Sequence, residues 1–168
     1  MGPNRKDAMT TPDITPETMN ALLRVLESHE TEDIGWANPE LHIVTATTVN
    51  DVLTITRHHI PAWKWSALLV GVIGAPGATG DAEHDLKLYA DTCEPMPGFL
   101  LVALTYDNES ESFERLAKRC LTAIDRNGKP YHLVREHGDE TPEFEPVAVP
   151  AAAPYGDVLA LLAFSLAR

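Results

Sequence analysis

The sequence predicts an α+β or α/β fold in which a mixed β-sheet of about five strands carries helices on its faces. Two unbroken apolar runs, residues 67–73 and 99–104, are typical of strands buried on both faces. Residues 81–93 between them have the spacing of an amphipathic helix, so the two strands are expected to pair in parallel through a right-handed crossover. A hairpin before them adds antiparallel strands, which makes the expected sheet mixed.

The N-terminal half predicts one helix followed by this β-hairpin. Thr15 is the expected helix cap, and apolar residues then recur on one face. That apolar stripe is Met19, Leu22, Leu23 and Leu26. Residues 41–48 and 52–60 are rich in Val, Ile and Thr, and the pair Asn50-Asp51 between them predicts the turn.

The C-terminal half predicts two more helices with a short strand between them. Residues 111–125 show apolar positions three and four apart and two Glu-to-basic pairs at i,i+4, which is typical of a helix. Asn127 and Gly128 are expected to end it, and residues 131–135 predict a short strand at a sheet edge. Residues 158–167 predict a last helix that is apolar on nearly every side and therefore needs cover.

These segments divide the chain into four parts. Residues 1–14 are expected to be a flexible leader and residues 15–135 a single α/β domain. Residues 136–154 are expected to be an acidic, proline-rich connector, because five acids crowd its first half and its prolines recur every four residues. Residues 155–168 form the predicted C-terminal helix.

The charge of the chain excludes several kinds of partner. The 168 residues carry 25 acidic and 13 basic side chains, a formal net charge of -12 at pH 7. An acidic surface repels the phosphate backbone and anionic lipids, so neither a nucleic-acid nor a membrane partner is expected. The sequence shows no apolar stretch of membrane-spanning length and no secretory signal, and a cytoplasmic location is therefore expected.

The glycine-rich loop at residues 74–80 is not expected to bind nucleotides. It follows a predicted strand and precedes a predicted helix, as phosphate-binding loops do. It lacks the Lys-Ser or Lys-Thr pair of a phosphate loop and the spacing of a dinucleotide fold, and three acids follow it instead: Asp81, Glu83 and Asp85. No cofactor is expected.

An acidic edge is the place where the sequence suggests a metal as the alternative. If the two apolar strands are parallel neighbours, their carboxyl ends bring Asp81 and Glu83 close to Asp107 and Glu109. Converging carboxylates hold Mg²⁺ or another divalent cation. Helix caps that face solvent explain the same residues, and we favour that interpretation.

No catalytic constellation stands out elsewhere. The histidines lack the spacing of a zinc motif, and Cys93 and Cys120 are expected to be buried thiols, with a disulfide between them left open. Trp63 and Trp65 lie on one face of a predicted strand, either in the core or at a partner surface.

Two functions follow from these observations. The first is a non-enzymatic, acidic interaction or regulatory protein that forms a homodimer and has a possible further protein partner. Its interface is expected on the last helix, because an exchanged terminal element is a low-cost route to a dimer. The expected interface residues are Val158, Leu159, Leu162, Phe164 and Leu166. The alternative is a divalent-metal-dependent enzyme with an acidic site at the carboxyl ends of the central strands.

Overall fold

The computed structural model describes residues 12–28, 39–61, 82–108, 118–136 and 139–168. In these ranges the chain forms one six-stranded antiparallel sheet and three α-helices, an α+β fold. The strand order across the sheet is β2-β1-β3-β4-β5-β6. The strands are β1 (Glu40–Val49), β2 (Val52–Pro61), β3 (Phe99–Asn108), β4 (Lys118–Asp125), β5 (Pro130–Glu136) and β6 (Glu143–Glu145).

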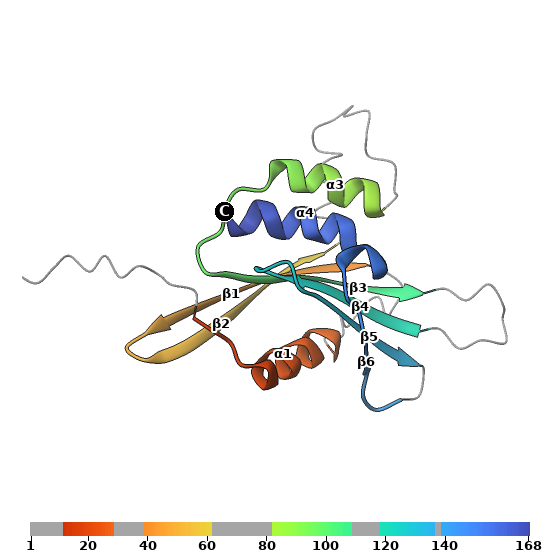
Figure 1. Cartoon of the computed structure of the whole chain (residues 1–168), viewed down its shortest axis with the longest axis horizontal. Helices are drawn as coiled ribbons and strands as arrows, with labels where there is room; N and C mark the ends of the chain where they lie inside the picture. Colours follow the sequence, from red (N-terminus) through yellow and green to blue (C-terminus); the bar gives the residue numbers. More distant parts are fainter. Residues whose placement is uncertain (1–11, 29–38, 62–81, 109–117, 137–138) are drawn as a thin grey trace, which may run out of the picture.

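The helices lie on opposite faces of the sheet (Figure 1). α1 (Pro16–Ser28) covers one face, whereas α3 (Ala82–Thr92) and α4 (Gly156–Ala167) lie together on the other. A short 3₁₀ turn, η1 (Pro150–Ala152), leads into α4. Each face therefore has its own hydrophobic core, and the central strands contribute to both.

The core under α1 follows from the predicted apolar stripe. α1 begins after Thr15, whose hydroxyl oxygen accepts a hydrogen bond from the Thr18 N–H at 3.2 Å. Leu23 and Leu26 are fully buried against the sheet. The sheet residues of this core are Val44, Ala46, Leu100, Leu101, Ala103, Leu121, Ala123 and Leu133.

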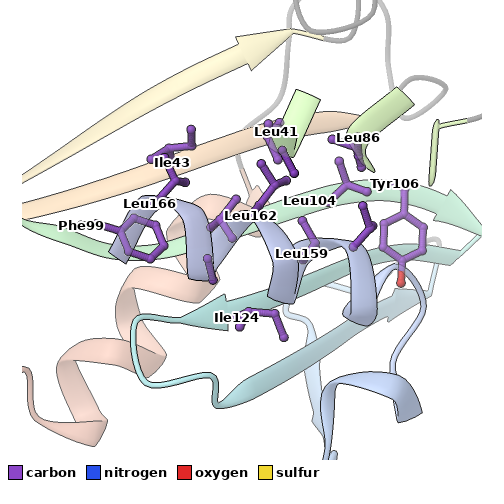
Figure 2. Close-up of a cluster of buried hydrophobic side chains, with 14 of the residues drawn as sticks. Leu41, Ile43, Leu86, Phe99, Leu104, Tyr106, Ile124, Leu159, Leu162 and Leu166 are labelled. Carbon is purple, nitrogen blue, oxygen red and sulfur yellow. The ribbon is translucent and has the colours of Figure 1, made fainter. Parts of the chain in front are cut away.

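The opposite core lies between the sheet and the pair α3 and α4 (Figure 2). Leu159, Leu162 and Leu166 extend from α4 toward the strands, and Leu86 enters the same core from α3. The strand residues they meet include Leu41, Ile43, Phe99, Val102, Leu104, Tyr106 and Ile124. The apolar last helix thus obtains much of its cover from the sheet of its own chain.

The predicted first helix, hairpin and 99–104 strand are confirmed. Asn50 and Asp51 both adopt positive φ, 51° and 63°, which is the type I′ geometry of a two-residue hairpin. β3 lies in the centre of the sheet and faces α1 and α4 with alternate residues. This position explains why residues 99–104 are apolar without interruption.

The prediction of a helix over residues 111–125 is wrong for residues 118–125, which are the part that the structure describes. Lys118–Asp125 is β4, a central strand paired with β3 and β5. Cys120 faces α4 and Leu121 faces α1, so both faces of the strand are buried. A short apolar run of this kind also satisfies helical spacing. Gly128, at φ 81°, accordingly belongs to the turn between β4 and β5 instead of ending a helix.

The sheet also differs in detail from the predicted mixed sheet. Every strand pair within the described ranges is antiparallel. The strand predicted over 67–73, the loop 74–80, Trp63 and Trp65 lie outside the described residues. The sequence predicts β5 at an edge of the sheet, but β5 lies inside the sheet. The reason is that β6 forms within the predicted connector and pairs with β5.

The position of Val102 predicts a measurable contribution to stability. Its side chain is 0% exposed in the centre of β3. We expect Val102→Ala to lower the free energy of unfolding by roughly 1–3 kcal/mol, through lost burial and the cavity left behind. Urea denaturation measures this change. The matched control is Val149→Ala, at 53% exposure, which should change stability by less than about 0.5 kcal/mol; equal effects would contradict the assigned core.

Candidate functional site

Charged side chains are buried where the end of α1 meets β4 and β5. Glu27, in the last turn of α1, is fully buried. Arg135 donates a hydrogen bond to Glu27 Oε2 at 2.5 Å, and Arg119 Nε lies 3.7 Å from Glu27 Oε1. Arg119 and Arg135 are neighbours across β4 and β5, so one carboxylate bridges two cations. We call these three residues the Glu27 cluster.

Burial and the two arginines act on Glu27 in opposite directions. Burial disfavours the charged carboxylate and raises its pKa, whereas Arg135 and Arg119 lower it. Burial has the larger effect, so the pKa of Glu27 is raised above 4.5. Because the carboxylate is already engaged by two guanidinium groups, the Glu27 cluster acts as an anchor that ties the last turn of α1 to two strands.

A second polar group lies at the β1–β2 pair, on the same face of the sheet. His42 and His59 are cross-strand partners whose rings stack with centroids 5.1 Å apart. His59 Nε2 lies 3.3 Å from Glu40 Oε2, and both Glu40 and His42 are buried. Imidazole and carboxylate groups serve proton transfer or metal binding. Across the residues that the structure describes, however, no three His, Cys, Asp or Glu side chains are placed to hold a metal ion.

A chain of hydrogen bonds crosses the opposite face from β3 to β6. The Tyr106 hydroxyl lies 2.9 Å from Thr122 Oγ1 and 3.4 Å from His132 Nε2. His132 Nδ1 in turn lies 3.1 Å from Glu145 Oε2. Tyr155 packs edge-on against Tyr106, with ring centroids 4.8 Å apart. Burial raises the pKa of Tyr106, so its phenol is neutral at physiological pH.

The order carboxylate, imidazole, hydroxyl in this chain is that of a proton relay. A relay acts on a substrate only where the reacting hydroxyl opens onto a space that holds one. The three cavities described next contain none of its residues in their walls. Within the described structure these hydrogen bonds connect β3, β4, β5 and β6, and the ring contact joins Tyr155 to Tyr106.

Three cavities stand out in the described structure. One of about 230 Å³ lies between the start of α1 and the β4–β5 turn, and one of about 400 Å³ lies beside Pro97 and Arg168. The largest of these three, about 760 Å³, lies between the β1–β2 hairpin and the end of α3, and we call it the β2 groove. Its walls include Ile43, His58, Ile60, Tyr89, Cys93 and Met96.

Tyr89 and Cys93 form part of the α3 wall of the β2 groove, and both side chains are uncharged at neutral pH. Burial raises the pKa of Tyr89 to about 12 and also raises that of the Cys93 thiol. Cys93 and Cys120 are both free thiols, so the disulfide left open by the sequence is not formed.

Of the predicted acidic edge, the described ranges contain only Glu83 and Asp107. Glu83 is exposed in the first turn of α3. Asp107 stands near the end of β3, opposite Arg119 in the β3–β4 register. Asp81 and Glu109 lie outside the described residues. The predicted metal site therefore stays a prediction.

Most of the predicted interface residues on α4 lie in the core of their own chain. Val158, Leu159, Leu162 and Leu166 are each at most 3% exposed. Phe164 is 63% exposed, and Leu161, one turn before it, is 47% exposed. Only part of the helix surface is thus left for a partner, and Leu161, an apolar residue outside the expected interface set, belongs to it.

Comparison with known proteins identifies no relative: no family model, no curated protein and no solved structure matches the chain. None of the described helices has the length and apolar character needed to cross a membrane. The function is therefore argued from the residues and their geometry.

The Glu27 cluster predicts a large stability effect. Glu27→Ala leaves Arg119 and Arg135 without the carboxylate that neutralises them, and we expect the free energy of unfolding to fall by about 3–5 kcal/mol. Denaturant titration at pH 7 measures the change. The control is Glu140→Ala, an exposed carboxylate whose removal should change stability by less than about 0.5 kcal/mol. A loss below about 1 kcal/mol for Glu27→Ala would show that the cluster is not an anchor.

The raised pKa of Glu27 also predicts a pH dependence. The Glu27 carboxyl of the unfolded chain titrates near pH 4.5. As the pH falls from 7, the folded protein therefore takes up a proton at Glu27 before the unfolded chain does. Glu27 therefore adds to the free energy of unfolding as the pH falls. Its contribution is complete below pH 4.5 and is lost as the pH rises through the pKa of Glu27 in the folded protein. Glu27→Gln cannot titrate, so wild type should gain stability relative to this variant between pH 7 and 4.5. Parallel stability profiles for the two proteins would contradict the raised pKa.

Proposed function

We propose that the protein is an acidic interaction or regulatory protein that acts as a homodimer and has no catalytic reaction of its own. The observation that carries the proposal is the grouping of exposed apolar side chains. Seven large apolar side chains are exposed in the described ranges, and five of them lie either at the tip of the β1–β2 hairpin or on the outer face of α4. These residues are Val49, Val52 and Leu53 at the tip, and Leu161 and Phe164 on α4. Grouped exposed apolar residues mark contact surfaces, whereas single ones do not.

The hairpin tip extends beyond its neighbouring strand (Figure 1). β1 pairs with β3 only from Glu40 to Thr45, and the Ala46 N–H bonds to the Gly98 carbonyl at 2.8 Å. The residues beyond Ala46 pair with β2 alone among the described strands. A two-stranded ribbon is marginally stable in water by itself. An apolar ribbon tip therefore favours a second molecule as its cover.

The polar groups of the fold favour an interaction protein over an enzyme. The Glu27 carboxylate is engaged by two arginines, and the relay from Glu145 to Tyr106 lines none of the three cavities. Both groups hold elements together. The net charge of -12 keeps the protein soluble and suits a basic surface on a further protein partner.

Light scattering coupled to size exclusion tests the homodimer. At a chain concentration of tens of micromolar we expect a mass twice the 18.4 kDa of one chain. A monomer mass would refute the proposal. A thermal-shift titration with Mg²⁺ and Mn²⁺ is the companion measurement. Stabilisation by either ion that Asp107→Ala removes would favour the metal-dependent enzyme instead, because a ligand that binds only the folded state raises its melting temperature.

A further inference from the structure

We propose that two copies of this chain pair through β2, so that their sheets join across a two-fold axis. The proposal rests on the homodimer of the preceding section and assigns its surface. β2 forms one edge of the described sheet and pairs there with β1. An isologous contact of this kind uses the same strand from both copies.

The two edges of the described sheet are protected very differently. β6 has three residues, two of them Glu, and Pro142 and Pro146 stand beside it. A short, charged edge with prolines discourages further pairing. β2 has ten residues, pairs with β1 in an uninterrupted register and contains no proline before Pro61. Its length and regularity make it the edge suited to another strand.

The backbone of β2 presents a regular row of polar groups to such a strand. The two-residue turn makes Val49 and Val52 a hydrogen-bonded pair, and such pairs alternate along an antiparallel ladder. The odd-numbered residues of β2 therefore direct their N–H and C=O groups away from β1. Leu53, Ile55 and Arg57 are three of these residues.

β2 is also a surface on which two acidic molecules can approach. The whole chain carries 25 acidic side chains, yet the strand Val52–Pro61 contains none. Its charged or titratable residues are Arg57, His58 and His59. Two β2 strands therefore meet without the mutual repulsion of carboxylates that a net charge of -12 imposes elsewhere.

One antiparallel register matches the side chains of the two β2 strands without placing like charges opposite each other. With Thr56 of both copies at the two-fold axis, Ile55 lies opposite the partner's Arg57 and Val52 lies opposite the partner's Ile60. No two arginines face each other. Val52 is 62% exposed in a single chain, and Ile60 lines the β2 groove. The register thus gives Val52 an apolar neighbour at the mouth of the groove of the other copy.

A proline variant tests the pairing by its backbone requirement. The Arg57 N–H points away from β1, so Arg57→Pro removes a donor that the β1–β2 ladder does not use and that the partner strand would, and proline is tolerated on an edge strand. We expect Arg57→Pro to be a monomer by light scattering, with an unchanged far-UV circular dichroism spectrum. Arg57→Ala, which keeps the N–H, should remain a dimer and is the matched control.

Cysteine cross-linking tests the register even if the proline variant fails to fold. The two Thr56 residues would form a non-hydrogen-bonded pair with Cα atoms roughly 4.5 Å apart, within the range of a disulfide. In a Cys93→Ser background, Thr56→Cys should give a covalent dimer on mild oxidation. Thr54→Cys is the control, because its counterpart in the other copy would lie four residues along the strand, roughly 13 Å away.

The outcomes separate this proposal from the one on which it rests. A monomeric wild type overturns both. Two results would overturn β2 pairing and leave the homodimer intact. In the first, the wild type is a dimer but the Thr56→Cys variant forms no cross-link. In the second, the double variant Leu161→Ser, Phe164→Ser is a monomer. A cross-link at Thr56 without one at Thr54, together with a dimeric double α4 variant, establishes the β2 interface.

Discussion

The fold depends on covering both faces of one sheet with helices from separate parts of the described chain. β3 and β4 are buried on both sides, so neither α1 nor the pair α3 and α4 can be removed without exposing apolar residues. Each cover is secured by apolar packing and by polar contacts. Glu27 ties α1 to β4 and β5, and the bond between the Met96 N–H and the Leu166 carbonyl, 2.9 Å long, ties the end of α4 to the segment before β3.

β6 is a small element with contacts on both faces of the sheet. Arg24 of α1 stacks over the Phe144 ring at 5.3 Å, and Glu145 bonds to His132 on the opposite side. Alternation along a strand makes this possible, since neighbouring residues point to opposite faces. The segment that continues into η1 and α4 is therefore fixed to the sheet edge before the helix begins. This explains how a stretch rich in prolines and acids is ordered next to the core.

The sequence predicted those elements whose signals are local. The cap at Thr15, the turn at Asn50-Asp51 and the apolar run over 99–104 each have one physical explanation, and the structure has each of them. β4 was misread because Cys120 and Ile124 also fit a helical stripe. The Glu27 cluster carried a weak signal: Glu27 follows Leu23 by four residues and so lies on the buried stripe of α1. The pairing of His132 with Glu145 depends on the β5–β6 register, which no local pattern reveals.

The unequal edges of the sheet limit how far the molecule can assemble. A protein with two open edges can polymerise, because every added copy presents a new edge to the next. Here the three-residue β6, with its glutamates and adjacent prolines, blocks growth on one side. Any assembly built on β2 uses up its growing end in the first contact and terminates as a closed pair. Within the described sheet, pairing through β2 would therefore end at two copies and would not continue as a fibre.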